Sequence, residues 1–526
     1  MRLGDLVGID NHKPADLVGI DNHKPADLVG IDNHKPAGLV GIDSHKPAAL
    51  VGISVHKPAD LMEAERSIEV TGVAIDSRQV TKGALFGAFP GSVHNGEDFI
   101  ASAIERGAVA VVARPQANVD GAVHLADPEP RRLFARLAAK LFSPYPDTIV
   151  AVTGTNGKTS SVEMVRQLWR LAGHRSASIG TLGVTTADEQ VSTGLTTPDI
   201  VTFLSNLAGL RRMGISHVAY EASSHGLDQF RSEGQPVAAA AFTNLSRDHL
   251  DYHTDMDAYF AAKMRLFDEV VDAGGTAVVW TGDPRSGKVV ARVEARGLAL
   301  ITVGPGAATI ELVSQSPTPL GQTLLLRHGG KEHELALPLI GAYQAANVLV
   351  AAGLVLATGG KWATTLAGLS RLSPVRGRLE RAVISPAGAP VYVDYAHTPD
   401  AIEAAIAALR PHVAGKLIIV FGAGGDRDTG KRAPMGEVAG RLADVAIVTD
   451  DNPRSEDPAR VRAQVIAGAT GLREIGDRRA AIAAAIAEAR DGDIVLLAGK
   501  GHEQGQILSD RTIPFDDAAV ARECAA

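Results

Sequence analysis

Hydrophobic residues gather in short runs that alternate with longer stretches of helical periodicity through most of the chain. In residues 147–374 the apolar runs predict strands at 148–152, 217–221, 238–243 and 276–280. Apolar residues at helical spacing predict helices at 160–172, 345–357 and 364–369. Strands that alternate with helices are typical of a parallel, three-layer α/β sheet, which is the fold class we predict.

The same pattern continues on both sides of this segment. Before it, residues 59–146 predict a smaller domain, with strands at 73–75, 84–89 and 108–113 and a helix at 97–106. This domain ends near Pro144-Tyr145-Pro146, a sequence typical of a linker. After it, residues 375–526 predict a doubly wound, Rossmann-like sheet, with strands at 391–394, 417–421, 445–449 and 494–498.

Residues 1–58 interrupt this pattern with a tandem repeat of eleven residues. The unit Ala-Asp-Leu-Val-Gly-Ile-Asp-Asn-His-Lys-Pro decays in later copies, and its histidines are His12, His23, His34, His45 and His56. One interpretation is an array of histidines that binds metal or mediates adhesion. We favour a disordered extension, because each unit offers only Leu, Val and Ile for burial, too little to offset the entropy of ordering.

Composition narrows the class of protein. The net charge of −8 argues against a protein that coats nucleic acid, since such proteins carry basic surfaces. Cys524 is the only cysteine, so no disulfide forms within the chain. The N-terminus lacks the apolar core of a signal peptide, and the longest uncharged apolar stretch, at 345–357, is shorter than the roughly 20 residues of a membrane span. We therefore predict a cytoplasmic protein without nucleic-acid or membrane partners.

A phosphate-binding loop is predicted at Gly154-Thr155-Asn156-Gly157-Lys158-Thr159-Ser160, between a strand and a helix. Glycines let backbone N–H groups approach phosphate oxygens, and the helix N-terminus favours negative charge. Lys158 would neutralise the β- and γ-phosphates, and the Thr159 hydroxyl would bind Mg²⁺. The strict P-loop has glycine where this chain has Val152, so the loop is a shortened variant. The alternative is a glycine turn with an exposed lysine.

A second glycine cluster, Gly422-Ala-Gly424-Gly425-Asp-Arg427, approaches a dinucleotide fingerprint. Arg427 occupies the position of its third glycine. We do not predict a dinucleotide cofactor there.

Three further motifs accompany the phosphate loop, namely Glu221-Ala-Ser-Ser-His225, Asn244-Leu-Ser-Arg-Asp-His249-Leu-Asp251 and Tyr259-Phe-Ala-Ala-Lys263. With them the chain resembles the Mur ligases, the ATP-dependent peptide ligases of peptidoglycan synthesis, from about residue 60 to its end. The resemblance implies an N-terminal UDP-sugar-binding domain, a central ATP-binding domain and a C-terminal amino-acid-binding domain, at 59–146, 147–374 and 375–526. It also implies an acid–amino-acid ligase that acts through an acyl phosphate and whose domains close around the substrates.

Asp76-Ser77-Arg78, Thr196-Thr197-Pro198 and Asp451-Asn452-Pro453-Arg454 narrow the resemblance to one branch. Its members add meso-diaminopimelate, the third residue of the stem peptide, to UDP-MurNAc-L-Ala-D-Glu. Lysine-adding relatives differ at 451–454. Diaminopimelate has a distal carboxylate that lysine lacks, and arginine can hold a carboxylate through two parallel hydrogen bonds. Residues 451–454 also read as a turn, since Asn-Pro favours one, and the two roles are compatible.

The resemblance assigns the reaction centre. It implies catalytic roles for Lys158, His249 and Lys263, and Mg²⁺ ligands at Thr159, Glu221, His249 and Lys263, the last as a carbamate. The plainer interpretation of Lys263 is a surface lysine on a helix. His249 and His253 could be mistaken for a zinc pair, which we do not favour without a His-Glu-x-x-His context. His225 is expected to be structural or to contact the substrate.

The remaining implied residues contact the substrates, in a protein we expect to be a monomer. ATP is expected at 154–160 and at Asn347, Arg378 and Asp394. The UDP-sugar substrate is expected at Ser77, Thr196, Thr197, Ser223, Gln229 and Arg231. Diaminopimelate is expected at Arg427, Asp451, Asn452, Pro453, Arg454, Gly499 and Glu503.

Three alternatives stay open. A different member of the same superfamily, such as a folylpolyglutamate synthase, is opposed by Asp76-Ser77-Arg78 and by 451–454. A P-loop switch or motor ATPase would need neither a pocket for a second carboxylate nor the Lys263 motif. A repeat-bearing binding protein with a degenerate enzyme body is opposed by the intact Lys158, Glu221 and Lys263.

Overall fold

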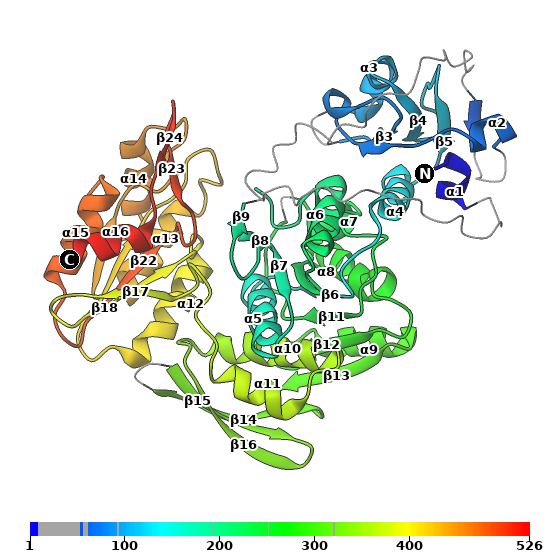
Figure 1. Ribbon diagram of the computed structural model, residues 1–526. Coiled ribbons are helices and arrows are strands. Elements are labelled where there is room, and N and C mark those ends of the chain that lie inside the picture. The colour runs from blue at the N-terminus through cyan, green and yellow to red at the C-terminus, as the bar shows by residue number, and fades with distance from the viewer. Residues whose placement is uncertain (9–52, 56–60, 92–93, 193, 251, 319–320) are drawn as a thin grey trace. The chain divides into compact units, whose positions relative to one another are not determined.

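The computed structural model describes the chain except for residues 9–52, 56–60, 92–93, 193, 251 and 319–320 (Figure 1). It divides into two compact units. The first comprises residues 1–279 and 283–301, and the second comprises residues 280–282 and 302–526. Both are α/β structures built mainly on parallel strands, which confirms the predicted fold class. The finer domain boundaries at 58, 146 and 374 stay predictions.

The first unit opens with a five-stranded parallel sheet in the order β1-β5-β4-β3-β2. Its strands are β1 (Ile53–Val55), β2 (Gly72–Ala74), β3 (Ala84–Gly87), β4 (Ala108–Ala113) and β5 (Val123–Ala126). The accompanying helices are α1 (Leu3–Val7), α2 (Glu63–Arg66), α3 (Ile100–Glu105) and α4 (Pro130–Phe142). The strands expected at 73–75, 84–89 and 108–113 correspond to β2, β3 and β4.

Helix α1 corrects the prediction that residues 1–58 are a disordered extension, as far as residues 1–8 are concerned. Leu3 and Leu6 are completely buried. The Leu3 amide donates to Ile68 O at 2.8 Å, and Lys140 Nζ donates to Leu6 O at 2.8 Å. Tertiary contacts therefore stabilise a short helix that its own length would not. The repeat histidines His12, His23, His34, His45 and His56 lie outside the described residues.

A larger sheet follows in the first unit, in the order β12-β11-β6-β10-β7-β8-β9. Its strands are β6 (Thr148–Thr153), β7 (Ser176–Gly180), β8 (Gly183–Thr185), β9 (Gln190–Val191), β10 (His217–Glu221), β11 (Ala239–Phe242) and β12 (Thr276–Trp280). Its helices are α5 (Lys158–Leu171), α6 (Ile200–Arg212), α7 (Ser224–Asp228), α8 (Met256–Arg265) and α9 (Ser286–Arg296). Strands β6, β7, β10, β11 and β12 are parallel, so their carboxyl ends lie at one edge.

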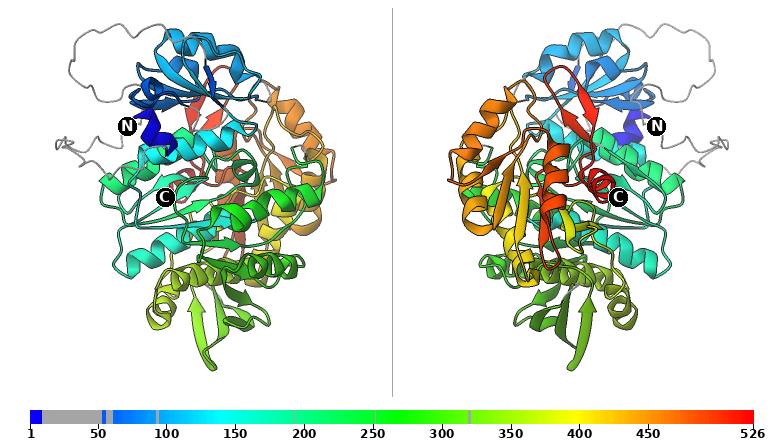
Figure 2. Two further views of the ribbon diagram at one scale, coloured as in Figure 1. Left: turned by 90° about the vertical axis from the view of Figure 1, so that its right-hand side faces the viewer. Right: turned by 90° about the vertical axis from the view of Figure 1, so that its left-hand side faces the viewer.

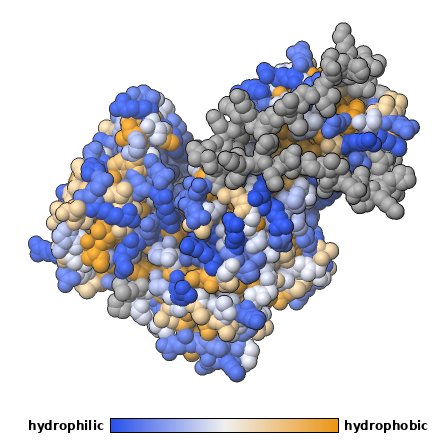
Figure 3. Space-filling model, in the orientation of Figure 1, coloured by the Kyte–Doolittle hydropathy of each residue, from blue (hydrophilic) through white to orange (hydrophobic). Residues whose placement is uncertain are grey.

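The chain passes into the second unit within β13 (Ala299–Gly304). There it forms an antiparallel meander of β14 (Ile310–Thr318), β15 (Gly321–His328) and β16 (Lys331–Leu337), then helices α10 (Tyr343–Ala357) and α11 (Trp362–Leu369). Charged residues such as Arg327, Lys331 and Glu332 make the far end of the meander hydrophilic, at the bottom of Figure 3.

A six-stranded sheet completes the second unit, in the order β17-β18-β22-β19-β20-β21. Its strands are β17 (Glu380–Ile384), β18 (Pro390–Asp394), β19 (Leu417–Phe421), β20 (Val445–Val448), β21 (Arg473–Glu474) and β22 (Ile494–Ala498). Helices α12 (Pro399–Leu409), α13 (Arg432–Leu442) and α14 (Pro458–Ile466) cover one face, and α15 (Arg478–Glu488) and α16 (Asp517–Cys524) cover the other (Figures 1 and 2). Strands β23 (Gly505–Ile507) and β24 (Thr512–Pro514) form a separate antiparallel hairpin that is not part of this sheet.

Among the helices that the structure describes, none is both long and apolar enough to cross a membrane.

Candidate active site

The predicted phosphate loop joins the buried strand β6 to helix α5. Gly154 has φ +145°, and a Cβ there would lie 1.9 Å from Thr243 Oγ1, so only glycine fits this turn. The loop is braced by its neighbour along the sheet, since the Thr155 amide donates to Asn244 O and the Asn156 amide donates to Asn244 Oδ1, both at 2.9 Å. Strand, turn and helix N-terminus thus form a rigid cradle suited to an anion.

Lys158 is half-buried at the start of α5 and folds back over the loop. Its Nζ donates to Gly154 O at 2.9 Å and to Thr155 O at 2.8 Å. A glycine turn with an exposed lysine does not describe this geometry, because the ammonium group lies against the loop.

Glu221 ends β10, the strand between β6 and β7, and is 1% exposed. Its Oε2 accepts from Thr159 Oγ1 at 3.0 Å, and its Oε1 accepts from the Thr181 amide at 2.7 Å. A Cβ on Gly180 would lie 2.1 Å from Glu221 Oε1. The structure thus brings together Thr159 and Glu221, two of the predicted Mg²⁺ ligands, as oxygen donors of the kind that Mg²⁺ prefers.

Lys263 is buried in α8 with an exposed fraction of 1%, so the interpretation as a surface lysine is wrong. Its Nζ donates to Gly154 O at 2.7 Å and lies 4.4 Å from the centre of the Tyr259 ring. Burial, reinforced by the charge of Lys158, holds the pKa of the Lys263 amine well below its usual value. A buried amine of low pKa is a better nucleophile near neutral pH than an ordinary lysine.

His249 belongs to a cluster of rings close to the loop. Its ring lies 4.8 Å from that of His225 and 6.1 Å from that of Tyr259, between centroids. The Tyr259 hydroxyl lies 3.2 Å from Thr155 Oγ1, which ties the cluster to the phosphate loop. Among the residues that the structure describes, no three His, Cys, Asp or Glu side chains gather to hold a metal.

Five of the six residues expected to contact the UDP-sugar form one hydrogen-bonded network beside Glu221. Thr197 Oγ1 donates to Glu221 O at 2.9 Å and lies 2.9 Å from Ser223 Oγ. Arg231 Nη1 donates to Thr197 O at 3.1 Å, and Arg231 Nη2 donates to Gln229 Oε1 at 2.7 Å. Thr196 Oγ1 lies 3.1 Å from the hydroxyl of Thr181. Ser77 is buried in the first sheet's domain, and within the described ranges no hydrogen bond joins it to this network.

The second unit holds the remaining expected nucleotide contacts. Asp394 ends β18 and accepts from the Leu379 amide at 2.8 Å and the Ala396 amide at 2.9 Å. Burial raises the pKa of Asp394, and the nearby Arg378 opposes the rise. The Arg378 guanidinium lies 4.6 Å from the centre of the Tyr395 ring. Asn347 is buried in α10, where its amide donates to Gln344 Oε1 at 3.0 Å.

The residues expected to bind diaminopimelate converge at the carboxyl ends of β19, β20 and β22, the edge at which open α/β sheets bind ligands. Asn452 Nδ2 donates to Glu503 Oε2 at 2.8 Å, and Arg454 Nη1 donates to Gly425 O at 2.8 Å. A Cβ on Gly499 would lie 2.4 Å from Asp451 Oδ2. Pro453 is buried beside them, whereas Arg427 is exposed on the loop after β19.

A buried arginine holds the two loops of this site together. Arg432, at the start of α13, donates to Glu456 from Nη1 at 2.9 Å and from Nη2 at 2.8 Å, and Nη2 also donates to Gly424 O at 3.1 Å. The Asp426 amide donates to Glu456 Oε1 at 2.6 Å. The loop of Gly424 and Asp426 is thereby fixed against that of Arg454.

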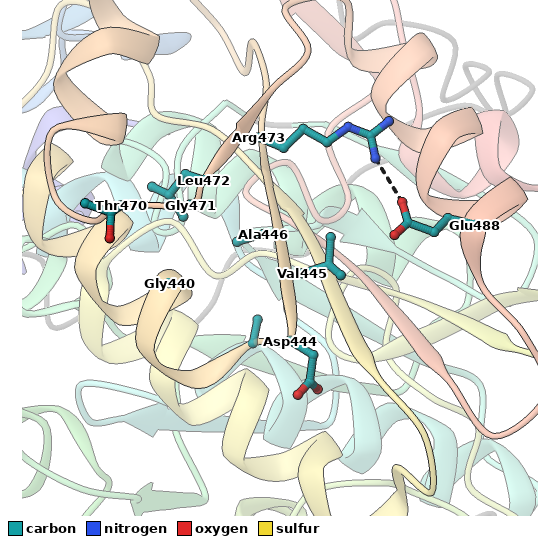
Figure 4. Close-up of a pocket in the computed structure, with 10 residues that line it drawn as sticks. Gly440, Asp444, Val445, Ala446, Thr470, Gly471, Leu472, Arg473 and Glu488 are labelled. Atoms are coloured by element: carbon teal, nitrogen blue, oxygen red, sulfur yellow. Dashed lines mark hydrogen bonds and ion pairs between the residues drawn. The ribbon is translucent and has the colours of Figure 1, made fainter.

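A cavity of about 260 Å³ lies at the opposite, amino ends of β20 and β21 (Figure 4). Arg473 and Glu488 form an ion pair of 2.8 Å on its wall, and Asp444 also lines the cavity. None of the expected site residues lines this cavity.

Comparison with known families identifies the chain. Three family profiles match successive stretches, described as Mur ligase family, catalytic domain (69–142), Mur ligase middle domain (152–355) and Mur ligase, glutamate ligase domain (377–501). A curated relative from Zymomonas mobilis is 58% identical over 467 residues, which is 88% of this chain and 96% of the relative. The chain belongs to the Mur ligase family.

Individual relatives and solved structures show which Mur ligases the chain is similar to. The Zymomonas protein and a relative from Caulobacter vibrioides, 49% identical over 86% of this chain and 94% of its own, both carry the name UDP-N-acetylmuramoyl-L-alanyl-D-glutamate–2,6-diaminopimelate ligase. A solved structure of that name superposes with a TM-score of 0.68 at 30% identity, over 89% of this chain and 97% of its own. Folylpolyglutamate synthase of Mycobacterium tuberculosis shares the fold alone, with a TM-score of 0.58 and 20% identity over 71% of this chain and 92% of its own.

Several residues near the site of this Mur ligase were not predicted from the sequence. Thr181 follows β7, a strand we did not predict, and reaches Glu221 only through the pairing of β7 with β10. Tyr252 accepts from Gln229 Nε2 at 3.1 Å. Arg432 and Lys500 are buried beneath the loops of the C-terminal domain. For Lys500 the signal was available, because it lies between Gly499 and Glu503 in sequence.

Proposed function

We propose that this Mur ligase joins meso-2,6-diaminopimelate to UDP-N-acetylmuramoyl-L-alanyl-D-glutamate, with hydrolysis of ATP to ADP and phosphate, in peptidoglycan biosynthesis. The names of relatives that span nearly the whole chain support this proposal. The observation that carries it is the placement of Arg454 and Glu503, the latter held by Asn452, at the carboxyl ends of the C-terminal sheet. A substrate with a second carboxylate and an ammonium group finds a partner of opposite charge for each there.

The first step transfers the γ-phosphoryl group of ATP. An oxygen of the D-Glu side-chain carboxylate attacks the γ-phosphorus, the bond to the β–γ bridging oxygen breaks, and ADP leaves. Lys158 and the backbone amides of 157–160, at the start of α5, bind the phosphates, which lowers the repulsion between the two anions. The hydrogen-bonded network of Thr197, Ser223 and Arg231 binds the carboxylate-bearing substrate next to the phosphates.

Mg²⁺ bound at this centre would supply charge neutralisation for the transferred phosphoryl group. Thr159 and Glu221 offer it oxygen donors 3.0 Å apart. We propose that the Lys263 amine adds to CO₂ and loses a proton, which gives a carbamate whose oxygens extend the donor set. The burial and low pKa of Lys263 favour the neutral amine that this addition requires. His249 is the fourth proposed ligand.

The second step forms the amide. The amine of diaminopimelate attacks the acyl-phosphate carbonyl carbon, the C–O bond to phosphate breaks, and the nitrogen loses a proton. We propose that Arg454 and Arg427 bind the distal carboxylate, and that Asp451, Asn452, Gly499 and Glu503 shape the rest of the pocket. Asn347, Arg378 and Asp394 are proposed to contact the nucleoside of ATP.

The deciding experiment measures ADP release from ATP with UDP-MurNAc-L-Ala-D-Glu, with meso-diaminopimelate, with lysine and with neither. We expect rapid release only with meso-diaminopimelate, and a product of the matching mass. Equal rates with lysine, or release that is independent of the amino acid, would contradict the proposal. Fractionation of cells and sedimentation of the purified protein test the cytoplasmic location and monomeric state that we also propose.

A further inference from the structure

Lys500 lies two residues after the end of β22 and is completely buried. Its Nζ donates to Asn452 Oδ1 at 2.9 Å and to Glu503 Oε2 at 3.2 Å. A buried ammonium group is costly unless it is paired and hydrogen-bonded, so these two contacts are what make its position tenable. Lys500 thus lies behind two side chains that the proposed function places against the amino acid.

The hydrogen bonds of Lys500 determine which way the Asn452 amide faces. Asn452 Oδ1 accepts from Lys500 Nζ and from the Ile507 amide at 3.0 Å, so the oxygen is committed inward. Asn452 Nδ2 is then free to donate to Glu503 Oε2 at 2.8 Å. Glu503 Oε2 accepts two hydrogens, and within the part of the chain that the structure describes no hydrogen bond engages Oε1.

The positive charge of Lys500 also acts on the acids around it. Asp451 and Glu503 are neighbouring acids, and burial raises the pKa of Asp451, with Glu503 and Asp517 adding to the rise while Arg478 and Lys500 oppose it. Arg478 is already paired with Asp517 at 2.6 Å, and both side chains are completely buried. Lys500 is thus a second buried cation, beside Arg478, that opposes the rise in the pKa of Asp451.

Other charged and titratable groups face these acids from neighbouring elements. Lys431, which precedes α13, faces Asp451, and Tyr395, which follows β18, faces both Asp451 and Glu503. His397 faces Glu503 and has its pKa lowered by burial. Lys431 is half-buried, and for its ammonium group no hydrogen bond is found among the described residues, so it does not replace the contacts of Lys500.

We propose that Lys500 is a positioning residue, which orients Asn452 and holds Glu503 through Oε2 so that Glu503 Oε1 receives an ammonium group of the incoming amino acid. The inference rests on the proposed function, since that function places Asn452 and Glu503 at the amino-acid site. Lys500 itself touches no substrate in this arrangement.

The test compares Lys500→Met, which removes the charge at similar size, with Lys500→Gln, which keeps an N–H donor for Asn452. The matched control is Lys416→Met, an exposed lysine of the same domain. For Lys500→Met we expect the KM for the amino acid to rise roughly ten- to hundredfold, since a charged hydrogen bond is lost and Asn452 is released. The KM values for ATP and for the UDP-sugar should stay within about twofold of wild type.

The pH profile separates positioning from mere structural support. Lys500 opposes the rise in the pKa of Asp451, so without its positive charge Asp451 keeps its proton to higher pH. The acid limb of kcat/KM for the amino acid should therefore shift upward in both Lys500 variants. Lys500→Gln should recover part of the KM but not the pH shift. A folded Lys500→Met with an unchanged acid limb, or with all three KM values raised alike, would overturn the proposal.

Two provisions keep the result decisive. If Lys500→Met does not fold, Lys500→Gln carries the same comparison, and an unshifted acid limb in it would equally overturn the proposal. The wild-type enzyme with meso-diaminopimelate tests the proposed function separately, and the variants are assayed with whichever amino acid the wild type accepts.

Discussion

Thr159 Oγ1 donates a hydrogen bond of 3.0 Å to Glu221 Oε2, which joins the first turn of α5 to the end of β10. The two residues are 62 apart in sequence, and they meet because β6, which precedes α5, pairs in parallel with β10. A hydroxyl and a carboxylate that contact each other at a phosphate loop are placed to share one divalent cation.

Thr159 variants test this shared site. We expect Thr159→Val to lower kcat by roughly tenfold or more and to raise the Mg²⁺ concentration needed for half-maximal activity, because one oxygen donor is lost. Thr159→Ser keeps the hydroxyl and should stay within about threefold of wild type. Titration of ADP release with MgCl₂ measures both effects. An unchanged Mg²⁺ requirement in Thr159→Val would remove Thr159 from the metal site.

Lys263 should make the enzyme depend on CO₂. In CO₂-depleted buffer we expect activity to fall and to recover on addition of bicarbonate, whereas Lys263→Ala should be inactive and insensitive to bicarbonate. Burial lowers the pKa of the amine, so the neutral form persists to lower pH than in a free lysine. Recovery by bicarbonate should therefore remain effective near neutral pH and fail only as the pH falls through the lowered pKa. The exposed Lys288→Ala is the control.

Arg454 should govern the choice between amino acids. Arg454→Ala removes the cation that meets the distal carboxylate, so we expect the ratio of kcat/KM for meso-diaminopimelate over lysine to fall by roughly ten- to hundredfold. Arg460→Ala, an exposed arginine close by in sequence, should leave the ratio unchanged. Competition assays with both amino acids measure the ratio, and a full preference retained by Arg454→Ala would contradict the assignment.

Helix α1 should contribute to stability although it precedes the repeats. Leu3 and Leu6 are both completely buried, so we expect Leu3→Ala and Leu6→Ala each to lower the free energy of unfolding by roughly 2–5 kcal/mol. Met62→Ala, at a side chain 51% exposed, should change it by less than about 0.5 kcal/mol. Urea titration followed by circular dichroism measures the difference.

A deletion separates the helix from the repeats. Removal of residues 9–41 takes out three repeat lengths and again places an isoleucine after Gly8. Since α1 is retained, we expect the unfolding midpoint and ADP release to match the full chain. Removal of residues 1–41, which also takes out α1, should lower the midpoint. Equal behaviour of the two deletions would mean that α1 adds nothing to stability.

The sequence predicted the parts of the fold whose signals are local. Strand β6, the glycine loop and α5 follow one another directly, so their apolar run, glycines and helical spacing could be read in order. Strand β7 escaped because Ser176–Gly180 is short and mixes serine with small apolar residues. The β14–β16 meander was missed although its strands are long, because polar and charged residues interrupt the apolar positions of β14 and β16.

In the site, too, the residues with a local motif were predicted, whereas their long-range contacts were not. Glu221 and Lys263 were found by motif, but the burial of Lys263 against Gly154 depends on a contact between residues 109 apart. Helix α1 carries the same Leu-Val-Gly as the repeat copies, and its order depends on distant partners such as Ile68 and Lys140. Such long-range contacts have no signature in a single sequence.

The close approach of Gly180 to Glu221 has a consequence for how this enzyme can vary. Gly180 has no functional group and lies on an ordinary strand, yet any side chain there would meet the Glu221 carboxylate at 2.1 Å. Alanine at 180 must therefore displace the residue that Thr159 and Thr181 hold in place. In a complete survey of single substitutions selected for growth, position 180 should tolerate as few replacements as position 221, although it takes no part in the chemistry.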